Sequence, residues 1–344
     1  MTSISEAVAA VVSGRDLTYD EARSVMDAIM SGECSNVMIS SYLTALAVKG
    51  ETVEEIAGSA AEMRAHGLKL PGDHSRDLEI VGTGGDKSGS FNISTTSSFA
   101  VAACGVNVAK HGNRAMSSKS GAADVLEALG AKLDNPPEKT ADVLAQCGFA
   151  FMFAQVYHTS MKYVGPVRKE LGFRTVFNIL GPLTNPASAG NQFSGVYSPD
   201  LIEPLARVLD RLGVSNALVV YGTDGLDEMS VSAETQCGEM RSGRFETYTV
   251  APEDFGLERS PHDALIGGGP QENAAITRAV LSGEKGPRRD TVLLNAGAGL
   301  YTAGKAKSIQ EGIEMAANAI DTGEALRRLD LYVKLTGGGD ADSS

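Results

Sequence analysis

The first 67 residues carry the apolar spacing of helices. Ile4, Val8, Val11 and Val12 share one helical face, which predicts a helix at the N-terminus. A further helix is expected over about 37–49. Glycines follow the second, third and fourth predicted helices, at Gly32, Gly50 and Gly67. Four short helices of this kind predict a small bundle.

Two capping-box signatures indicate where the second and fourth helices begin. Thr18-Tyr19-Asp20-Glu21 and Thr52-Val53-Glu54-Glu55 each place a threonine three residues before a glutamate. In this pattern each side chain accepts a hydrogen bond from the other residue's backbone N–H. Leu70-Pro71-Gly72-Asp73 follows the fourth helix and indicates a boundary.

From residue 78 onward, short apolar runs typical of buried strands alternate with longer runs of helical period. Strands are expected at 78–81, 106–109, 149–153, 193–197, 217–222 and the start of 291–299. Helices are expected at 92–104, 122–130, 136–148, 201–212, 309–320 and on to about 335. The stretch 240–290 is rich in turns. The alternation predicts an α/β fold with a mostly parallel central sheet.

The chain therefore divides into a helical domain over 1–72 and an α/β domain over 73–159 and 185–336. Residues 160–184 interrupt the alternation with two helical stretches, and we assign them to the helical domain. Residues 337–344 are expected to be a disordered tail.

Composition excludes several classes of function. The 344 residues carry a formal net charge of −13, which disfavours binding to a nucleic-acid backbone. No apolar run approaches the ~20 residues of a membrane span, and the N-terminus lacks the features of a signal peptide. The four cysteines have no CxxC spacing, which favours a reduced compartment. We expect a cytoplasmic protein without a nucleic-acid or membrane partner.

One stretch, 110–121, differs from an ordinary connector. It lies between a predicted strand and a predicted helix, where α/β folds hold their ligands. Lys110, Arg114 and Lys119 share it with serines and glycines. Glycine allows a ligand to approach the backbone, serine donates hydrogen bonds, and the next helix adds partial positive charge. These features favour a bound anion such as phosphate, and a solvated loop is the alternative.

A second glycine-rich loop, 82–90, follows the strand expected at 78–81. It departs from the Walker spacing because Asp86 precedes Lys87, and Lys87 also stands where the dinucleotide fingerprint needs its third glycine. We interpret it as a general phosphate or diphosphate loop, with a tight turn as the alternative. The next helix begins with hydrogen-bonding side chains at Asn92, Ser94 and Thr95.

Asp227 and Glu228 are adjacent acids after the strand expected at 217–222. Magnesium is commonly held by one or two carboxylates together with substrate phosphates, so the pair is a candidate metal site. A surface acid pair is the alternative. Taken alone, Arg168 fits an exposed helix arginine and His158 fits a structural histidine.

Six motifs follow one another along the chain: Gly82-Thr83-Gly84-Gly85-Asp86, Asn92-Ile93-Ser94-Thr95, Lys110-His111-Gly112-Asn113-Arg114 with Ser117-Ser118-Lys119-Ser120-Gly121, Gly165-Pro166-Val167-Arg168, Asn178-Ile179-Leu180-Gly181-Pro182-Leu183-Thr184-Asn185-Pro186, and Asp227-Glu228. As a set they closely resemble the anthranilate phosphoribosyltransferase family, from the first helix to about residue 335. The first motif alone is shared with pyrimidine nucleoside phosphorylases.

The resemblance implies a small helical domain and a larger α/β domain of the nucleoside phosphorylase/phosphoribosyltransferase type. It implies a homodimer formed through the helical domain. It further implies Mg²⁺-dependent transfer of the phosphoribosyl group of phosphoribosyl pyrophosphate (PRPP) to the amine of anthranilate. The products would be N-(5-phosphoribosyl)anthranilate and pyrophosphate, in tryptophan biosynthesis.

The resemblance also implies which residues bind each ligand. For PRPP they are Gly82, Gly85, Asp86, Ser90, Asn92, Ile93, Ser94, Thr95, Lys110, His111, Gly112, Asn113, Arg114, Ser117 and Ser118. For anthranilate they are Gly82, Asn113, His158 and Arg168. For Mg²⁺ they are Ser94, Asp227 and Glu228.

Three points stay open at this stage. The chemistry needs no obligatory base, and His111 and His158 are the candidates for one. Ala122 stands where the family often has serine, so a hydroxyl contact to the substrate phosphate is lost there. A nucleoside phosphorylase and a non-catalytic nucleotide-binding relative are alternative functions, and the joint presence of Arg168, Asn113 and the Asp227–Glu228 pair disfavours the second.

Overall fold

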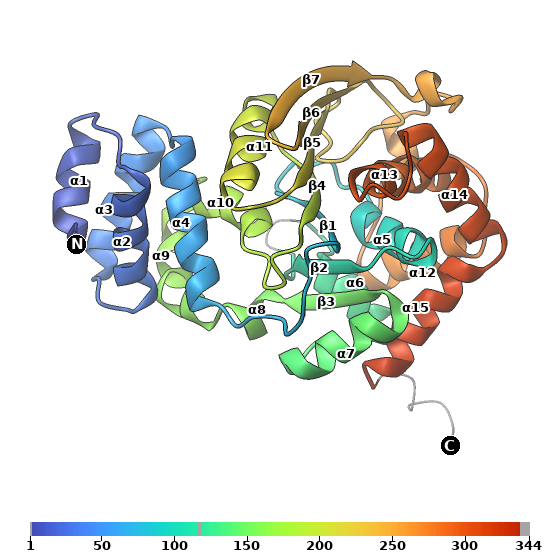
Figure 1. Cartoon of the computed structure of the whole chain (residues 1–344), viewed down its shortest axis with the longest axis horizontal. Coiled ribbons are helices and arrows are strands. Elements are labelled where there is room, and N and C mark those ends of the chain that lie inside the picture. Colours follow the sequence, from blue (N-terminus) through green and yellow to red (C-terminus); the bar gives the residue numbers. More distant parts are fainter. Residues whose placement is uncertain (1, 116–117, 338–344) are drawn as a thin grey trace.

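The computed structural model describes residues 2–115 and 118–337. Its N-terminal part is a bundle of four helices, blue in Figure 1. They are α1 (Ile4–Val12), α2 (Tyr19–Met30), α3 (Asn36–Lys49) and α4 (Val53–His66). The expected tail lies outside the described residues except for Gly337, and so does the expected PRPP contact Ser117.

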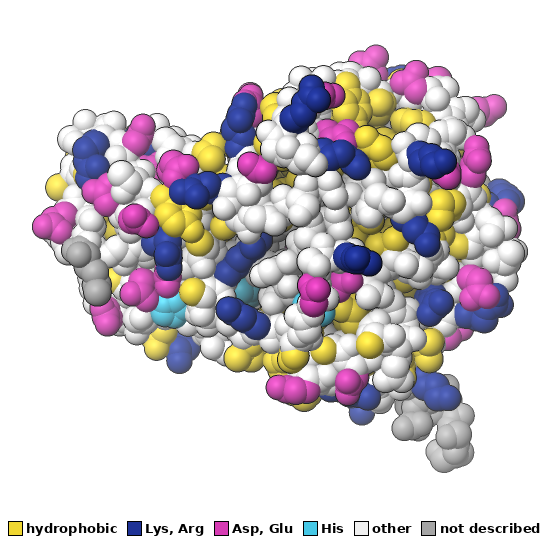
Figure 2. All heavy atoms as spheres, viewed as in Figure 1, with side chains coloured by type: hydrophobic (Ala, Val, Ile, Leu, Met, Phe, Trp, Pro, Cys, Tyr) yellow, Lys and Arg dark blue, Asp and Glu magenta, His cyan; other side chains and the backbone are white. Residues whose placement is uncertain are grey.

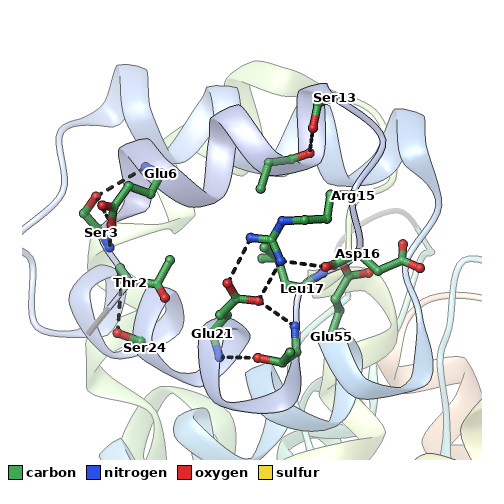
Figure 3. A network of polar contacts seen from close by, with 12 residues as sticks. Thr2, Ser3, Glu6, Ser13, Arg15, Asp16, Leu17, Glu21, Ser24 and Glu55 are labelled. Atoms are coloured by element: carbon green, nitrogen blue, oxygen red, sulfur yellow. Dashed lines mark hydrogen bonds and ion pairs between the residues drawn. The ribbon is translucent and has the colours of Figure 1, made fainter.

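Both capping boxes predicted from the sequence are confirmed. Thr18 and Glu21 cap α2 reciprocally, and Thr52 and Glu55 do the same for α4. Figure 3 shows Glu21 also binding the guanidinium of Arg15. Glu55 is fully buried and accepts a hydrogen bond of 2.9 Å from the backbone N–H of Leu17, which ties the start of α2 to α4.

The remainder of the chain contains one seven-stranded sheet in the order β3-β2-β1-β4-β5-β6-β7. The first five strands in that order are parallel, and the last two are antiparallel, which confirms the predicted, mostly parallel sheet. The strands are β1 (Leu78–Gly82), β2 (Val108–Gly112), β3 (Phe149–Phe153), β4 (Asn191–Gly195), β5 (Asn216–Gly222), β6 (Thr235–Arg241) and β7 (Arg244–Val250).

Helices cover both faces of this sheet (Figure 1). The α-helices beyond the bundle are α5 (Ile93–Ala103), α6 (Ala122–Ala128), α7 (Pro137–Cys147), α8 (Ala154–Tyr157), α9 (Gly165–Leu171), α10 (Phe177–Leu180), α11 (Ile202–Arg211), α12 (Pro270–Leu281), α13 (Pro287–Thr302), α14 (Ile309–Asp321) and α15 (Glu324–Leu335). Short 3₁₀ segments are η1 (Thr159–Tyr163), η2 (Gly181–Leu183), η3 (Pro199–Leu201), η4 (Pro252–Phe255) and η5 (His262–Leu265).

Two large apolar cores hold these layers together. One core lies on the face of the sheet covered by α5 and α13 to α15. The other begins among α1 to α4, includes side chains from 164–183, and continues through α11 onto the opposite face of the sheet. Arg64 of α4 strengthens this junction, because its Nε donates a 2.7 Å hydrogen bond to the carbonyl of Leu183. The helical bundle therefore shares its core with one side of the sheet.

The strand expected at the start of 291–299 is wrong, because α13 runs without a break from Pro287 to Thr302. Its residues are buried on nearly every side, so the run Thr291-Val292-Leu293-Leu294 shows no amphipathic period and resembles a buried strand. Gly297 faces Gly312 of α14, where an added Cβ would lie 2.5 Å from a backbone oxygen. The small residues thus allow two helices to touch.

The turn-rich interpretation of 240–290 overlooked a hairpin and a helix. β6 and β7 pair over their full length, and α12 follows. β7 forms one edge of the sheet, and its residues are exposed or half-buried, with Arg244 and Glu246 among the exposed ones. Charged residues at alternate positions conceal a strand from a reading based on apolar runs.

Among the described residues, none of the helices has both the length and the apolar character needed to cross a bilayer.

Candidate functional site

The loops singled out in the sequence meet at the carboxyl edge of the sheet. β1 lies between β2 and β4, so the chain leaves it at the point where the strand order reverses. In open α/β sheets ligands bind in the crevice at such a point. The loops that follow β1, β2, β4 and β5 all reach this edge, and the site is assembled from them.

Two glycines make room for Asp227 at this edge. The backbone N–H of Gly84 donates a 2.7 Å hydrogen bond to Oδ2 of Asp227. A Cβ on Gly82 would lie 2.4 Å from that same oxygen, and one on Gly195 would lie 1.5 Å from the Asp227 backbone oxygen. Any side chain at the end of β1 or β4 would therefore displace the acid.

Three carboxylates act on one another here. Burial, together with the negative charges of Asp86 and Glu228, raises the pKa of Asp227 well above its usual range. Burial raises the pKa of Glu228 to about 7, although Lys110 and hydrogen bonding from Ser94 oppose the shift. Oδ2 of Asp86 is buried and has no hydrogen-bond partner among residues 2–115 and 118–337. Crowded, hard oxygen ligands of this kind fit Mg²⁺, which would relieve the repulsion.

Lys110 brings positive charge to the same place. It lies in the middle of β2, is only 2% exposed, and donates to the hydroxyl of Ser94 at 3.1 Å and to the carbonyl of Ile80. Burial lowers the pKa of Lys110, whereas Glu228 and Glu79 favour its charged form.

The first turn of α5 fits an anion beside this lysine. Thr95 is fully buried, and its hydroxyl has no hydrogen-bond partner among the described residues. The helix N-terminus adds partial positive charge at this point. Ile93 makes a different contribution, because its side chain belongs to the apolar core.

Asn92 is fixed by a residue that the sequence analysis overlooked. Asn273 of α12 is buried and donates a 2.9 Å hydrogen bond to Oδ1 of Asn92. Its own Oδ1 accepts from the backbone N–H of Gly268. Ser120 exchanges two further hydrogen bonds with Asn92. The only signal in the sequence was the triple-glycine run before α12, which we interpreted as a flexible connection.

The far end of the 82–90 loop is held by η5 and the residues after it. Nε2 of His262 lies 3.1 Å from the carbonyl of Ser88, and its Nδ1 lies 3.5 Å from Asp224. Gly267 donates to the carbonyl of Gly89. The Ser88 carbonyl first, and then the carboxylate of Asp224, raise the pKa of His262.

The 110–121 stretch begins as strand, since β2 extends to Gly112. The loop proper is closed by Asp124, which accepts 2.8 Å hydrogen bonds from the backbone N–H groups of Ala115 and Gly121. The guanidinium of Arg114 pairs with Glu127 of α6 and packs over the ring of Phe153. Asn113, Ser118 and Lys119 are exposed. In this arrangement the positive charge of Arg114 is therefore paired with the carboxylate of Glu127 on α6.

The two candidate histidines lie together below this loop. The rings of His111 and His158 are edge-on with centroids 5.0 Å apart. Nδ1 of His111 faces the carbonyl of Gly181 at 3.3 Å, and Nε2 of His158 faces the carbonyl of Thr184 at 2.9 Å. Burial lowers the pKa of both, that of His111 to about 3. Burial therefore favours the neutral form of both rings.

Arg168 projects from α9 and stands apart from the carboxylate group. Its guanidinium packs over the ring of Phe177, 5.4 Å from the centroid. Its side chain forms no hydrogen bond or ion pair within the part of the chain that the structure describes, and burial lowers its pKa. Figure 2 shows Lys and Arg side chains, with histidines beside them, on the face where the helical bundle meets the sheet.

The sequence matches two families over most of its length. Residues 5–67 match the helical bundle domain of a glycosyl transferase family, and residues 75–326 match the α/β domain of a glycosyl transferase family. An anthranilate phosphoribosyltransferase of Methanobrevibacter smithii is 56% identical over 333 residues, which cover 97% of this chain and 99% of the relative.

Solved structures agree with these matches. Anthranilate phosphoribosyltransferase from Thermus thermophilus superposes with a TM-score of 0.92 at 48% identity, covering 96% of this chain and 99% of the other. The enzyme from Saccharomyces cerevisiae in complex with PRPP and Mg gives a TM-score of 0.89 at 30% identity, covering 97% and 98%. The same yeast enzyme in complex with 4-fluoroanthranilate gives a TM-score of 0.84 at 30% identity, covering 93% and 94%.

The raised pKa of His262 predicts a pH-dependent loop. A group with a raised pKa stabilises the folded loop fully at acidic pH and loses that contribution as pH rises through the folded-state pKa. Because His262 is partly exposed, we expect amide-exchange protection over 84–90 to fall only about threefold from pH 6 to pH 8. His262→Gln should abolish that dependence, whereas His66→Gln, on α4, should leave it intact. A pH dependence that persists in His262→Gln would exclude this anchor.

Proposed function

The chain belongs to the anthranilate phosphoribosyltransferase family, and from that membership we propose how its own residues share the reaction. The enzyme transfers the phosphoribosyl group of PRPP to the amine of anthranilate, giving N-(5-phosphoribosyl)anthranilate and pyrophosphate, with Mg²⁺. One observation carries the assignment of the site. Three crowded carboxylates face Lys110 and the first turn of α5 at the switch point of the sheet.

The chemistry requires charge neutralisation more than proton transfer. Breaking the bond between ribose C1 and the diphosphate builds positive charge on the ring and negative charge on the leaving group. A site that holds the amine near C1 and offers fixed donors to the diphosphate lowers that barrier. We assign the diphosphate to the 82–90 loop and the N-terminus of α5, with Lys110 beside it. Asn113, Arg114 and Ser118 complete the PRPP side from the loop after β2.

Mg²⁺ supplies the neutralising charge when bound. We assign it to Asp227 and Glu228, with the hydroxyl of Ser94, because these oxygens lie where negative charge is least compensated. Asp86 is the third acid of the group, and its buried Oδ2, which has no hydrogen-bond partner in the described part of the chain, supports a cation at this point. Besides binding the metal, the residues of the site orient both substrates.

Arg168 is our choice for the anthranilate carboxylate. Its guanidinium has no competing carboxylate among the described residues, and a planar guanidinium can bind a carboxylate through two hydrogen bonds. Gly82, Asn113 and His158 are proposed to line the path of the aromatic ring. His111 and His158 are poor general bases because of their lowered pKa values, which favours attack by the neutral amine without a strong base.

The activity has a direct test. Purified protein is mixed with anthranilate, PRPP and Mg²⁺, and the fluorescence of anthranilate is followed, with EDTA as control. The chain has no Trp, so the background is low. Magnesium-dependent loss of fluorescence is expected. A folded protein that causes no loss would exclude anthranilate as the acceptor, and nucleosides with phosphate would then be tested for phosphorolysis.

We also propose the domain division and the cellular setting. Residues 1–72 together with 160–184 form the helical domain, and 73–159 with 185–336 form the α/β domain. The apolar side chains that 160–184 contributes to the core of the bundle support this grouping. Four free cysteines support a reduced, cytoplasmic setting.

A homodimer through the helical domain is supported by an exposed apolar stripe. Val37 and Val48 lie three turns apart on α3 and are 73% and 83% exposed, and Val12 at the end of α1 is 71% exposed. α1 packs against α3, so these residues belong to one region of the surface. Large exposed side chains of this kind favour a protein partner, and a second copy of the chain is the simplest one.

Charge on this stripe should therefore separate the dimer. We expect Val37→Glu with Val48→Glu to convert a dimer into a monomer in sedimentation equilibrium. Leu68→Glu also places a charge on an exposed apolar residue, but outside α1 and α3, and should leave the dimer intact. A double variant that sediments like the wild type would rule out this interface.

Removing the guanidinium of Arg168 should act on one substrate. We expect Arg168→Ala to raise the KM for anthranilate about 10- to 100-fold, the size of a charge-assisted pair, and to leave the KM for PRPP within about twofold. Lys169→Ala removes a neighbouring exposed charge and is the matched control. Equal increases in the two KM values would contradict the assignment.

Replacing Asp227 or Glu228 should weaken the binding of Mg²⁺. We expect Asp227→Asn and Glu228→Gln each to raise the Mg²⁺ concentration for half-maximal rate by about tenfold or more, since each removes a hard anionic ligand. Glu234→Gln, at an exposed acid in the same β5–β6 connection, should change it little. An unchanged magnesium titration in both ligand variants would remove the pair from the metal site.

A further inference from the structure

Arg174 connects segments that belong to opposite sides of the site. It follows α9, the helix that carries Arg168. Its guanidinium stacks on the ring of Tyr197, 3.7 Å from the centroid, just after β4. From there Nη2 donates a 2.6 Å hydrogen bond to the carbonyl of Gly85 in the 82–90 loop. The stacked ring fixes the guanidinium, so the donor is aimed before any ligand arrives.

This hydrogen bond sets the direction of a peptide group. The described residues contain no cis peptide bond, so the carbonyl of Gly85 and the N–H of Asp86 point in opposite directions from one plane. With the carbonyl held toward Arg174, the N–H of Asp86 points away from it. Gly85 has φ +74°, and because glycine has no Cβ, other orientations of this peptide are sterically open to it in the absence of an anchor.

The loop needs an anchor at this position. Asp86 follows directly and lies among the like charges of Asp227 and Glu228, which repel it. Gly84 is held by Asp227, and Ser88 is held by His262. Between these two points, the side chain of Arg174 holds the loop through its hydrogen bond to the carbonyl of Gly85.

We propose that Arg174 is a positioning residue that orients the Gly85–Asp86 peptide for the diphosphate and couples this loop to the segment that carries Arg168. The proposal rests on the assignment of PRPP to the 82–90 loop. Because the anchor and Arg168 lie six residues apart on one segment, ordering of the loop by a diphosphate also orders the anthranilate side. Binding of the two substrates is therefore cooperative.

Steady-state kinetics test the positioning. Arg174→Ala should raise the KM for PRPP about tenfold, which corresponds to about 1.4 kcal/mol. The kcat should stay within about twofold, whereas the KM for anthranilate at saturating PRPP should rise about fivefold, because the variant no longer couples the two substrates. Arg174→Lys keeps the charge but loses the planar stack, and should recover only part of the effect. Lys169→Ala removes a positive charge from the same segment and should behave as the wild type.

A second measurement tests the coupling without turnover. Anthranilate is titrated by fluorescence with and without Mg²⁺-pyrophosphate, which cannot react. Pyrophosphate should tighten anthranilate binding about fivefold in the wild type and in Tyr197→Phe, which keeps the ring. In Arg174→Ala and Tyr197→Leu that factor should fall to about one, with thermal stability unchanged.

Several results would overturn the inference. A normal KM for PRPP in Arg174→Ala would exclude the positioning, and an equal rise in both KM values with a lowered melting temperature would indicate a merely structural arginine. Pyrophosphate that leaves anthranilate affinity unchanged in the wild type would exclude the coupling. An inactive wild type would instead refute the function on which the proposal rests, so the two failures can be told apart.

Discussion

The constraint on which this structure depends is the confinement of like charges at the end of the sheet. Burial makes the negative charges of Asp227 and Glu228 costly, Asp86 adds a further negative charge beside them, and Lys110 brings positive charge into the same group. An arrangement of this kind is unstable unless the backbone around it is held firmly. Much of the architecture near the site serves that purpose.

The anchors come from distant parts of the chain. The 82–90 loop is held by residues that follow β5, by η5, by the segment before α12 and by Arg174 after α9. Asn92 depends on α12, more than 180 residues further along the chain. Since each anchor belongs to a different element, the site exists only when the whole sheet and its helices are in place.

The sequence predicted well what local chemistry decides. Thr18 and Thr52 start helices because their side chains cap them, and short apolar runs mark β1 and the start of β2, the strands that precede the glycine-rich loops. It failed where long-range contacts decide. α13 looked like a strand because it is buried all round. Asn273, His262 and Arg174 act through partners 89 to 181 residues away, and no local spacing reveals such partners. The motifs of the site could be predicted from the sequence because they occur in the same order as in a known family.

The shared core has a consequence for whether the two domains can fold separately. Family boundaries divide the chain near residue 70, yet the apolar cluster of α1 to α4 runs without interruption into α11 and one face of the sheet. Cutting the chain at that boundary would leave two fragments, each exposing a large apolar surface to water. The boundary between the two matched families is therefore not a boundary between parts that fold independently.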